Sequence, residues 1–305
     1  MFLSAKYAIQ EKIGQGSFGA VYKATVRKTG DAVAIKFATA NVFSPKGETK
    51  FATIATAPEE TPEAAAEAAA ETEELARETL KQEAAICHYL RYHAGIVDVK
   101  WFGCDPARGA YIIMSYYDLS LQDWMQSGAQ VPLSAVDLPT GKAHTFVNNK
   151  TWVDFIQTLL NTLEYVHERE IIHRDIKPAN IMLRAGAPAT GAEPVLIDFG
   201  MSRRYTDEHG VHIPAGQTTG LIGSPMFASR HSHACHELSR RDDVESALYV
   251  AEYIRTGNRL PWRTSSSDVL GEKIRWCDAR VAYIPALALG FYDKPDYHVT
   301  DRLFH

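Results

Sequence analysis

The feature that most constrains the fold is a change of periodicity part-way along the chain. Residues 7–13, 20–26 and 32–37 are short runs of alternating or β-branched residues separated by turns, a pattern typical of strands. Over residues 152–166, apolar residues instead recur at the spacing of a helix face. Strands followed by helices, without regular βαβ alternation, indicate an α+β protein of two lobes. We expect an antiparallel β-sheet lobe over residues 1–114 and a mainly helical lobe over 115–305.

Composition places the chain among globular proteins. Of its 305 residues, 46% are hydrophobic and 23% charged, which excludes wholesale disorder. The four cysteines have no paired spacing and predict reduced thiols. No apolar run approaches the roughly 18 residues of a membrane span, and Lys6 stands too early for a signal peptide. We therefore expect an intracellular protein, cytoplasmic, nuclear or both.

The net charge of -5 is concentrated in one segment. Residues 59–80 contain eight Glu and one Arg, so the rest of the chain is close to neutral. A near-neutral remainder does not suit general binding of nucleic acid. The acidic tract lies within residues 41–80, which we expect to be a loop that leads into a long helix from about residue 63.

A glycine string separates the first two expected strands. Gly14, Gly16 and Gly19 form a GxGxxG pattern that is followed by a strand rather than by the helix of a dinucleotide-binding fold. The glycines are therefore expected at the tip of a hairpin. Such a hairpin can lay backbone N–H groups over phosphates, although a plain flexible turn has the same pattern.

Lys36 and Glu83 are charged residues at positions expected to be buried. Period 2 places Lys36 on the same strand face as Ala34, and Glu83 shares a helix stripe with apolar Ile86 and Leu90. A buried lysine needs an anion, so we expect a Lys36–Glu83 ion pair. The pair could orient Lys36 toward phosphates, or simply join strand to helix.

Two further sequence motifs contain candidate catalytic and metal-binding residues. In His173-Arg174-Asp175-Ile176-Lys177-Pro178-Ala179-Asn180, Asp175 can accept a proton from a hydroxyl, Lys177 can neutralise a phosphoryl group, and Asn180 can coordinate Mg²⁺. Asp198, in Asp198-Phe199-Gly200 after an apolar strand, suits a second Mg²⁺ ligand. Together with the glycine string and Lys36, in this order, they indicate phosphoryl transfer from Mg²⁺-ATP.

With these motifs the chain resembles the eukaryotic protein kinases. The loop HRDIKPAN is similar to the serine/threonine form, so the resemblance implies Ser and Thr hydroxyls of proteins as substrates, with ATP and Mg²⁺ as cofactors. A narrower resemblance, to the casein kinase I group, is carried by GSPMFASRHSHACHELSRRDDVESALYVAEYIRTGNRLPW, KWFGCDPARGAY, YYDLSLQDWM and FYDKPDYHVTDRLF. It implies the two-lobed kinase fold.

The resemblance also implies site residues. With Lys36 and Glu83, it implies a nucleotide site that includes Gly14, Gly16, Gly19, Val21, Ala34, Met182 and Ile197. Met114 is similar to the gatekeeper, followed by Ser115, Tyr116 and Tyr117 as the adenine-binding hinge; Tyr116 is an alternative gatekeeper. Asp243 corresponds to the buried acid that anchors the HRD backbone.

The chain departs from the family at several positions. The APE triplet is absent, and Ser229-Arg230-His231 occupies its place. Met226 stands where the casein kinase I group has an arginine of its anion site, and the segment between Trp262 and Asp293 is shortened. A preference for phosphate-primed substrates is therefore not implied.

Two other functions remain as alternatives. A pseudokinase could serve as a partner-binding scaffold, but the complete set of catalytic residue types argues against it. A small-molecule phosphotransferase would share the metal chemistry, but the long segment from Asp198 to Ser229 disfavours it. We expect a monomer, without nucleic acid or membrane, in which the insert at 41–80 either binds a regulatory partner or is a tolerated solvated insert.

Overall fold

The computed structural model describes residues 3–16, 19–38, 62–127, 150–185, 192–263, 268–282 and 284–298. Residues 41–61 of the expected insert lie outside these ranges. The chain divides into two compact units. The first comprises Met1–Arg91 with Val97–Tyr116, and the second Tyr92–Ile96 with Tyr117–His305. This division is two residues from the expected lobe boundary, and it assigns residues 92–96 to the second unit.

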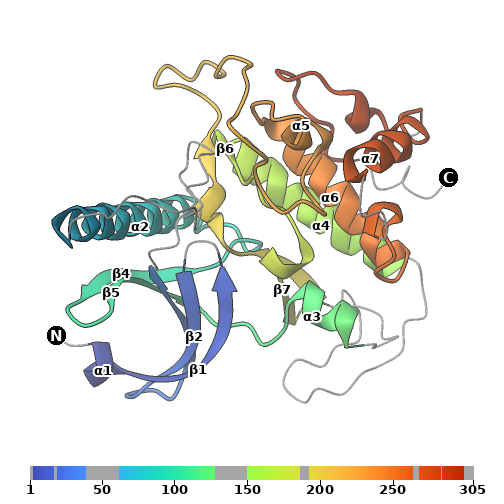
Figure 1. The fold of residues 1–305 in the computed structure, drawn as a ribbon. Coiled ribbons are helices and arrows are strands. Elements are labelled where there is room, and N and C mark those ends of the chain that lie inside the picture. Colours follow the sequence, from blue (N-terminus) through green and yellow to red (C-terminus); the bar gives the residue numbers. More distant parts are fainter. Residues whose placement is uncertain are drawn as a thin grey trace. The chain divides into compact units, whose positions relative to one another are not determined.

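The first unit is built on a five-stranded antiparallel sheet (Figure 1). The strands, in the spatial order β1-β2-β3-β5-β4, are β1 (Tyr7–Gly16), β2 (Gly19–Val26), β3 (Ala32–Ala38), β4 (Val99–Asp105) and β5 (Gly109–Ser115). A short helix, α1 (Leu3–Lys6), precedes them, and α2 (Pro62–Leu90) connects β3 to β4. The predicted antiparallel sheet is confirmed.

The two faces of β3 have different roles. Val33, Ile35 and Phe37 are buried in the apolar cluster of the sheet together with residues of β1, β2 and β5. Because side chains alternate along a strand, Ala34 and Lys36 lie on the opposite face. One face of the sheet therefore forms the core, while the other carries the predicted site residues.

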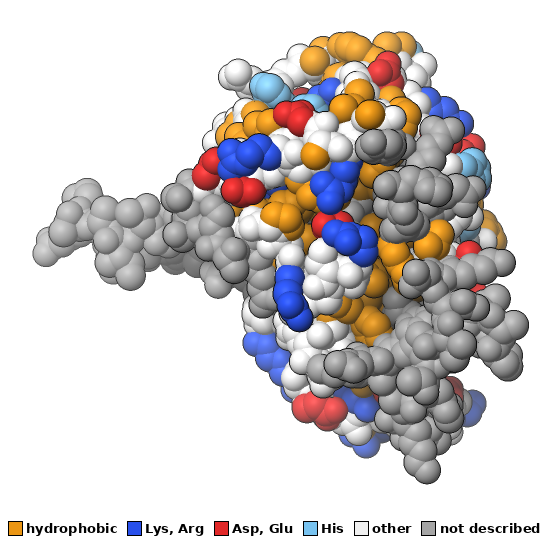
Figure 2. Space-filling view, turned by 90° about the vertical axis from the view of Figure 1, so that its right-hand side faces the viewer, with side chains coloured by type: hydrophobic (Ala, Val, Ile, Leu, Met, Phe, Trp, Pro, Cys, Tyr) orange, Lys and Arg blue, Asp and Glu red, His pale blue; other side chains and the backbone are white. Residues whose placement is uncertain are grey.

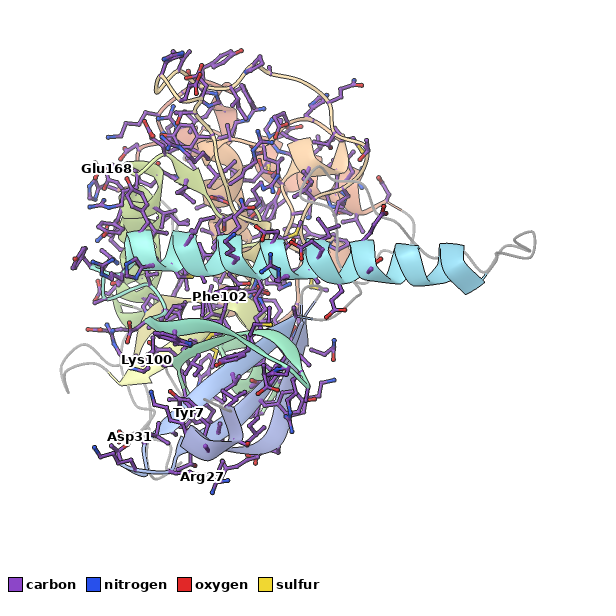
Figure 3. All side chains as sticks on the ribbon, turned by 90° about the vertical axis from the view of Figure 1, so that its left-hand side faces the viewer. Tyr7, Arg27, Asp31, Lys100, Phe102 and Glu168 are labelled. Carbon is purple, nitrogen blue, oxygen red and sulfur yellow. The ribbon has the colours of Figure 1, made fainter. Side chains whose placement is uncertain are left out.

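Helix α2 is long, and it packs on the sheet through its C-terminal part. It contacts β3, β4 and β5, and Leu80, Glu83, Cys87 and Leu90 are buried along one stripe. Figure 3 shows the N-terminal end of α2 extending past the strands. Glu83 is thus an acid on an apolar stripe, as its spacing predicted.

The second unit is mainly helical. Its helices are α3 (Leu121–Gln126), α4 (Lys150–His167), α5 (Arg230–His233), α6 (Arg240–Arg255) and α7 (Val269–Asp278), with 3-10 turns at Pro178–Asn180, Phe199–Met201, Pro261–Arg263 and Pro285–Ala288. Two small antiparallel sheets pair β6 (Ile171–Ile172) with β9 (Arg203–Arg204), and β7 (Ile181–Ala185) with β8 (Ala192–Leu196). Sheet first and helices later is the predicted α+β arrangement.

Helices α4 and α6 form the centre of this unit. The apolar stripe of α4 is buried and contacts α6 and β8. Helix α6 is buried from Asp242 to Tyr253 and starts with a carboxylate cap, since the Ser239 N–H donates to Asp242 Oδ2 at 2.7 Å. A helix that is buried all round provides a fixed frame for the loops packed on it.

No helix within the described ranges is long and apolar enough to cross a membrane. On the face shown in Figure 2, basic side chains lie singly or beside acidic ones.

Candidate active site

The glycine string lies on two paired strands. Strand β1 continues to Gly16 and β2 starts at Gly19, which pairs with Gly16. The expectation that the first strand ends at Ile13 was therefore three residues short, because glycine can adopt the extended backbone needed for pairing. A Cβ on Gly19 would lie 2.1 Å from the Phe37 carbonyl oxygen, so no side chain fits at this close approach of β2 to β3.

Lys36 and Glu83 meet inside the first unit. Lys36 Nζ donates to Glu83 Oε2 at 2.7 Å and to Oε1 at 2.9 Å, and both residues are 3% exposed. Burial makes either charge costly by itself, and the two-oxygen contact compensates each with the other. The ion pair fixes the direction of the Lys36 side chain on the face of β3 opposite the apolar cluster.

The other predicted nucleotide contacts of this unit surround Lys36 on the same face. In the strand register, Val21 lies opposite Lys36 and Ala34 lies opposite Met114. Cross-strand partners point to the same face of a sheet, so all four side chains share it.

The predicted hinge spans the boundary between the units. Ser115 ends β5, and its N–H donates to the Asp98 carbonyl at 2.9 Å. Tyr116 is the last residue of the first unit, with Lys23 Nζ 4.6 Å from the centre of its ring, and Tyr117 continues into the second unit. Because the Ser115 N–H is already used, that group is not available to an adenine ring.

Asp175, Lys177 and Asn180 form one cluster in the second unit. Asp175 Oδ2 accepts from Lys177 Nζ at 2.6 Å, and Asn180 Nδ2 donates to the Asp175 carbonyl at 3.0 Å and to Oδ2 at 3.2 Å. The remaining oxygen, Oδ1, accepts from the Ser224 N–H at 3.0 Å. Ser224 Oγ also accepts from Lys177 Nζ at 2.8 Å. Ser224 is a member of this cluster that the sequence analysis missed.

Asp198 is joined to the same cluster through the backbone. The Ile197 N–H donates to the Asn180 carbonyl at 3.0 Å, and His173 Nε2 donates to the Ile197 carbonyl at 3.2 Å. Asp198 itself has a left-handed backbone (φ 61°, ψ 68°), which is uncommon for a residue with a side chain. Met182 lies on the neighbouring strand β7, opposite Val195 of β8.

The donor set of Asn180 and Asp198 fits a magnesium ion. Since Asn180 Nδ2 donates to Asp175, the amide oxygen Oδ1 is the atom left for a cation. An amide oxygen and a carboxylate are oxygen ligands of the kind that Mg²⁺ prefers, usually together with phosphate and water.

Asp243 holds the backbone of the loop that leads to Asp175. Its Oδ2 accepts from the His173 N–H at 2.7 Å and its Oδ1 from the Arg174 N–H at 2.8 Å. Burial would raise the pKa of Asp243, but the hydrogen bond and charge of His167, with those of His173, hold it below the ordinary value. The ionised carboxylate stabilises Arg174 in its left-handed conformation (φ 69°).

Further residues complete this support. His167 Nε2 donates to Asp243 Oδ2 at 2.9 Å, and His167 Nδ1 lies 2.7 Å from the hydroxyl of Tyr297. A Cβ on Gly223 (φ +89°) would lie 2.6 Å from the Arg174 carbonyl oxygen. For His167, the only local pattern that could have predicted this role was its place on the buried stripe of α4. No local pattern predicted the roles of Gly223 and Tyr297.

The segment that replaces the APE triplet is tied to α6. Ser229 Oγ donates to Asp242 Oδ1 at 2.7 Å, and the Arg230 guanidinium forms an ion pair with Glu245 at 3.2 Å. His231 Nδ1 lies 3.0 Å from the same Asp242 oxygen. These contacts anchor the end of the segment that contains Ser224.

A family model described as the protein kinase domain matches residues 47–231, more than half of the chain. The chain belongs to the protein kinase family. Membership implies phosphoryl transfer from ATP to protein substrates, typically with Mg²⁺. The matched stretch includes Glu83, Asp175, Asn180 and Asp198. It begins after Lys36 and the glycine string, and ends before Asp243.

Proposed function

We propose that this kinase transfers the γ-phosphoryl group of ATP to serine and threonine hydroxyls of proteins, and that it is of the casein kinase I type. The observation that carries the proposal is the Asp175 cluster. Asp175 is held at both carboxylate oxygens, by Lys177 and by Ser224. A carboxylate positioned in this way can accept the proton of an incoming hydroxyl.

The residues of each unit have separate tasks in the proposed mechanism. In the first unit, Glu83 holds Lys36 so that its ammonium group can bind the α- and β-phosphates of ATP. In the second unit, Asp175 orients the hydroxyl and takes its proton, while Lys177 offsets the negative charge of the phosphoryl group. Asn180 and Asp198 would hold Mg²⁺, which when bound neutralises the phosphate oxygens.

The serine/threonine and casein kinase I assignments rest on sequence resemblance, with support from one contact. Lys177 is the residue that marks the serine/threonine form of the loop, and its Nζ links Asp175 to Ser224. The shortened segment after Trp262 leaves this cluster complete.

We further propose that phosphate-primed substrates are not preferred. Met226 replaces a basic residue of the family's anion site. Of the arginines nearby, Arg203 forms an ion pair with Glu237 and Arg204 with Glu170, while Arg174 Nε donates to the Met201 carbonyl at 2.6 Å. Because acidic side chains balance two of these charges, the segment offers little attraction to a second phosphate.

We also propose that the kinase acts as a monomer inside the cell, in the cytoplasm or nucleus. Within the described residues the four cysteines form no disulfide bond with one another, which suits a reducing compartment. A regulatory partner at the acidic insert would meet Glu71, Glu73 and Glu74, which are exposed on α2. Deletion of residues 45–75 tests that partner: unchanged kinetics and unchanged binding of co-purifying proteins would identify the segment as a solvated insert.

The test of the function is transfer of labelled γ-phosphate from Mg²⁺-ATP to casein. Wild type is compared with Asp175→Asn and with Asp278→Asn, a control at an exposed position of α7. We expect labelled casein with wild type and the control, and loss of labelling with Asp175→Asn. If wild type binds ATP but transfers no phosphate to casein or to itself, the scaffold function replaces the kinase function.

A further inference from the structure

Three carbonyl groups that follow Ser224 are held by two side chains from distant parts of the second unit. Lys273 Nζ, on α7, donates to the Pro225 carbonyl at 2.8 Å and to the Ala228 carbonyl at 2.5 Å. Trp262 Nε1 donates to the Met226 carbonyl at 2.8 Å. We call residues 225–228 the anchored segment.

The position of Lys273 is unusual for a lysine. The side chain is completely buried, with Nζ 4.9 Å from the ring centre of Tyr249 and 5.6 Å from that of Trp262. Within the described part of the chain its polar contacts are the two carbonyls and His233 Nε2, at 3.2 Å, and none is a carboxylate. A buried ammonium group without an ion pair is costly, so carbonyl binding is the role this geometry supports.

The anchored segment is coupled directly to the catalytic cluster. The N–H groups of Phe227 and Ala228 donate to the Ser224 carbonyl at 2.9 and 2.8 Å, which closes a tight turn on Ser224. Ser224 in turn contacts Asp175 through its N–H and Lys177 through its hydroxyl. A shift of the turn would therefore move the Ser224 N–H relative to Asp175 and the Ser224 hydroxyl relative to Lys177.

We propose that Lys273 is a positioning residue for phosphoryl transfer: with Trp262, it fixes the anchored segment and thereby holds Ser224 against Asp175 and Lys177. This inference rests on the proposed role of Asp175. Lys273 touches neither substrate nor nucleotide in this scheme and acts through the backbone turn. A lysine suits the task because one amine can donate to two carbonyls that diverge from the same turn.

The protonation chemistry of Lys273 is compatible with this role. Burial lowers its pKa to about 7, and the charge of Glu245 opposes that shift. A neutral amine still has two N–H groups, which are enough for the Pro225 and Ala228 carbonyls. The anchor therefore does not depend on the charge.

The first experiment compares Lys273→Met, which keeps the length of the side chain between the two rings, with Lys294→Met at an exposed control position. We expect Lys273→Met to lower kcat about tenfold, with KM for ATP unchanged, because it releases two backbone acceptors next to the catalytic cluster. Trp262→Phe, which removes one donor but keeps a ring, should lower kcat to a smaller extent. It provides a second test if Lys273→Met does not fold.

Two further readouts separate positioning from general destabilisation. Amide hydrogen exchange of the 224–228 backbone should become faster in both variants, relative to the core amides of α6. Ser224→Ala combined with Lys273→Met should lower kcat by less than the product of the single effects, because both act on one contact. Unchanged exchange at 224–228, or fully multiplicative effects on kcat, would overturn the proposal. If wild type proves to have no transferase activity, the proposed function fails, while hydrogen exchange still shows whether Lys273 anchors the segment.

Discussion

Lys36 Nζ lies 2.7 Å from Glu83 Oε2, although 47 residues separate the two and each is 3% exposed. The pair joins the third strand of the sheet to α2. Buried ion pairs contribute little net stability, because desolvation cancels much of the attraction. The pair is better explained as a device that sets the direction of Lys36 than as a source of stability.

Glu83→Gln should impair both folding and catalysis. The change removes the carboxylate charge that contacts Lys36 through both oxygens, which costs about 3 kcal/mol of unfolding free energy, and it loosens the hold of Glu83 on the ammonium group. Urea unfolding and ATP turnover measure the two effects. Glu78→Gln, on an exposed turn of the same helix, is the control and should change neither. Full activity of Glu83→Gln would show that Lys36 does not depend on the Glu83 charge.

Asp243→Asn should lower the free energy of unfolding at neutral pH but have less effect at acid pH. The pKa of Asp243 in the fold lies below its ordinary value. At pH values between the two, the unfolded state binds more protons than the folded state, so stability rises with pH. The contribution is present at neutral pH and is lost as pH falls through the folded pKa. We expect the free energy of unfolding of wild type to exceed that of Asp243→Asn by about 2 kcal/mol at pH 7. This difference should shrink toward pH 3. A difference that stays constant in urea titrations over this range would contradict the assignment.

Lys273 should make stability rise with pH above neutrality. Its pKa is about 7 in the fold against 10.5 for the ordinary side chain, so between these values the unfolded state holds the extra proton. The free energy of unfolding of wild type should rise by at most about 1.4 kcal/mol per pH unit relative to that of Lys273→Met.

The measurement is chemical unfolding of both proteins between pH 7 and 8.5. The titratable groups around Lys273 are His233 on α5, Glu245 and Tyr249 on α6, and Cys277 on α7. Burial raises the pKa of Cys277 to about 11 from 9.0. The Cys277 thiol therefore lowers the stability of the fold only above about pH 9, outside the range of this measurement. A difference between the two proteins that stays constant with pH would mean that Lys273 remains charged in the fold.

Gly223→Ala should be far more harmful than an alanine at another left-handed glycine. Its Cβ would meet the Arg174 carbonyl at 2.6 Å, whereas one on Gly257 (φ +59°) would meet nothing within 4 Å. We expect Gly257→Ala to cost about 1 kcal/mol from backbone strain alone and to keep its activity. Gly223→Ala adds displacement of the catalytic loop and should lose most of its kcat. If Gly223→Ala and Gly257→Ala lowered the unfolding temperature and kcat to the same extent, the steric explanation would be wrong.

Local patterns in the sequence were sufficient for the first three strands, for α2 and α4, and for several site residues. Alternation along residues 32–37 separated the core face from the face of Lys36, and helical spacing placed Glu83 on a buried stripe. Asp175 and Asn180 come together because five residues and a short 3-10 turn connect them. These relations are local, or depend only on the period of one element, which is why the sequence could predict them.

Tertiary structure alone decided which distant groups complete the site. Ser224 reaches Asp175 across 49 residues, and Lys273 reaches the Pro225 carbonyl across 48. No period or spacing encodes such contacts, because they depend on where distant segments of the chain lie after packing. Their partners are moreover backbone carbonyl and N–H groups, which every residue has and which leave no mark in the sequence. The sequence by itself determined the chemistry that the chain carries, and packing determined which groups hold that chemistry in position.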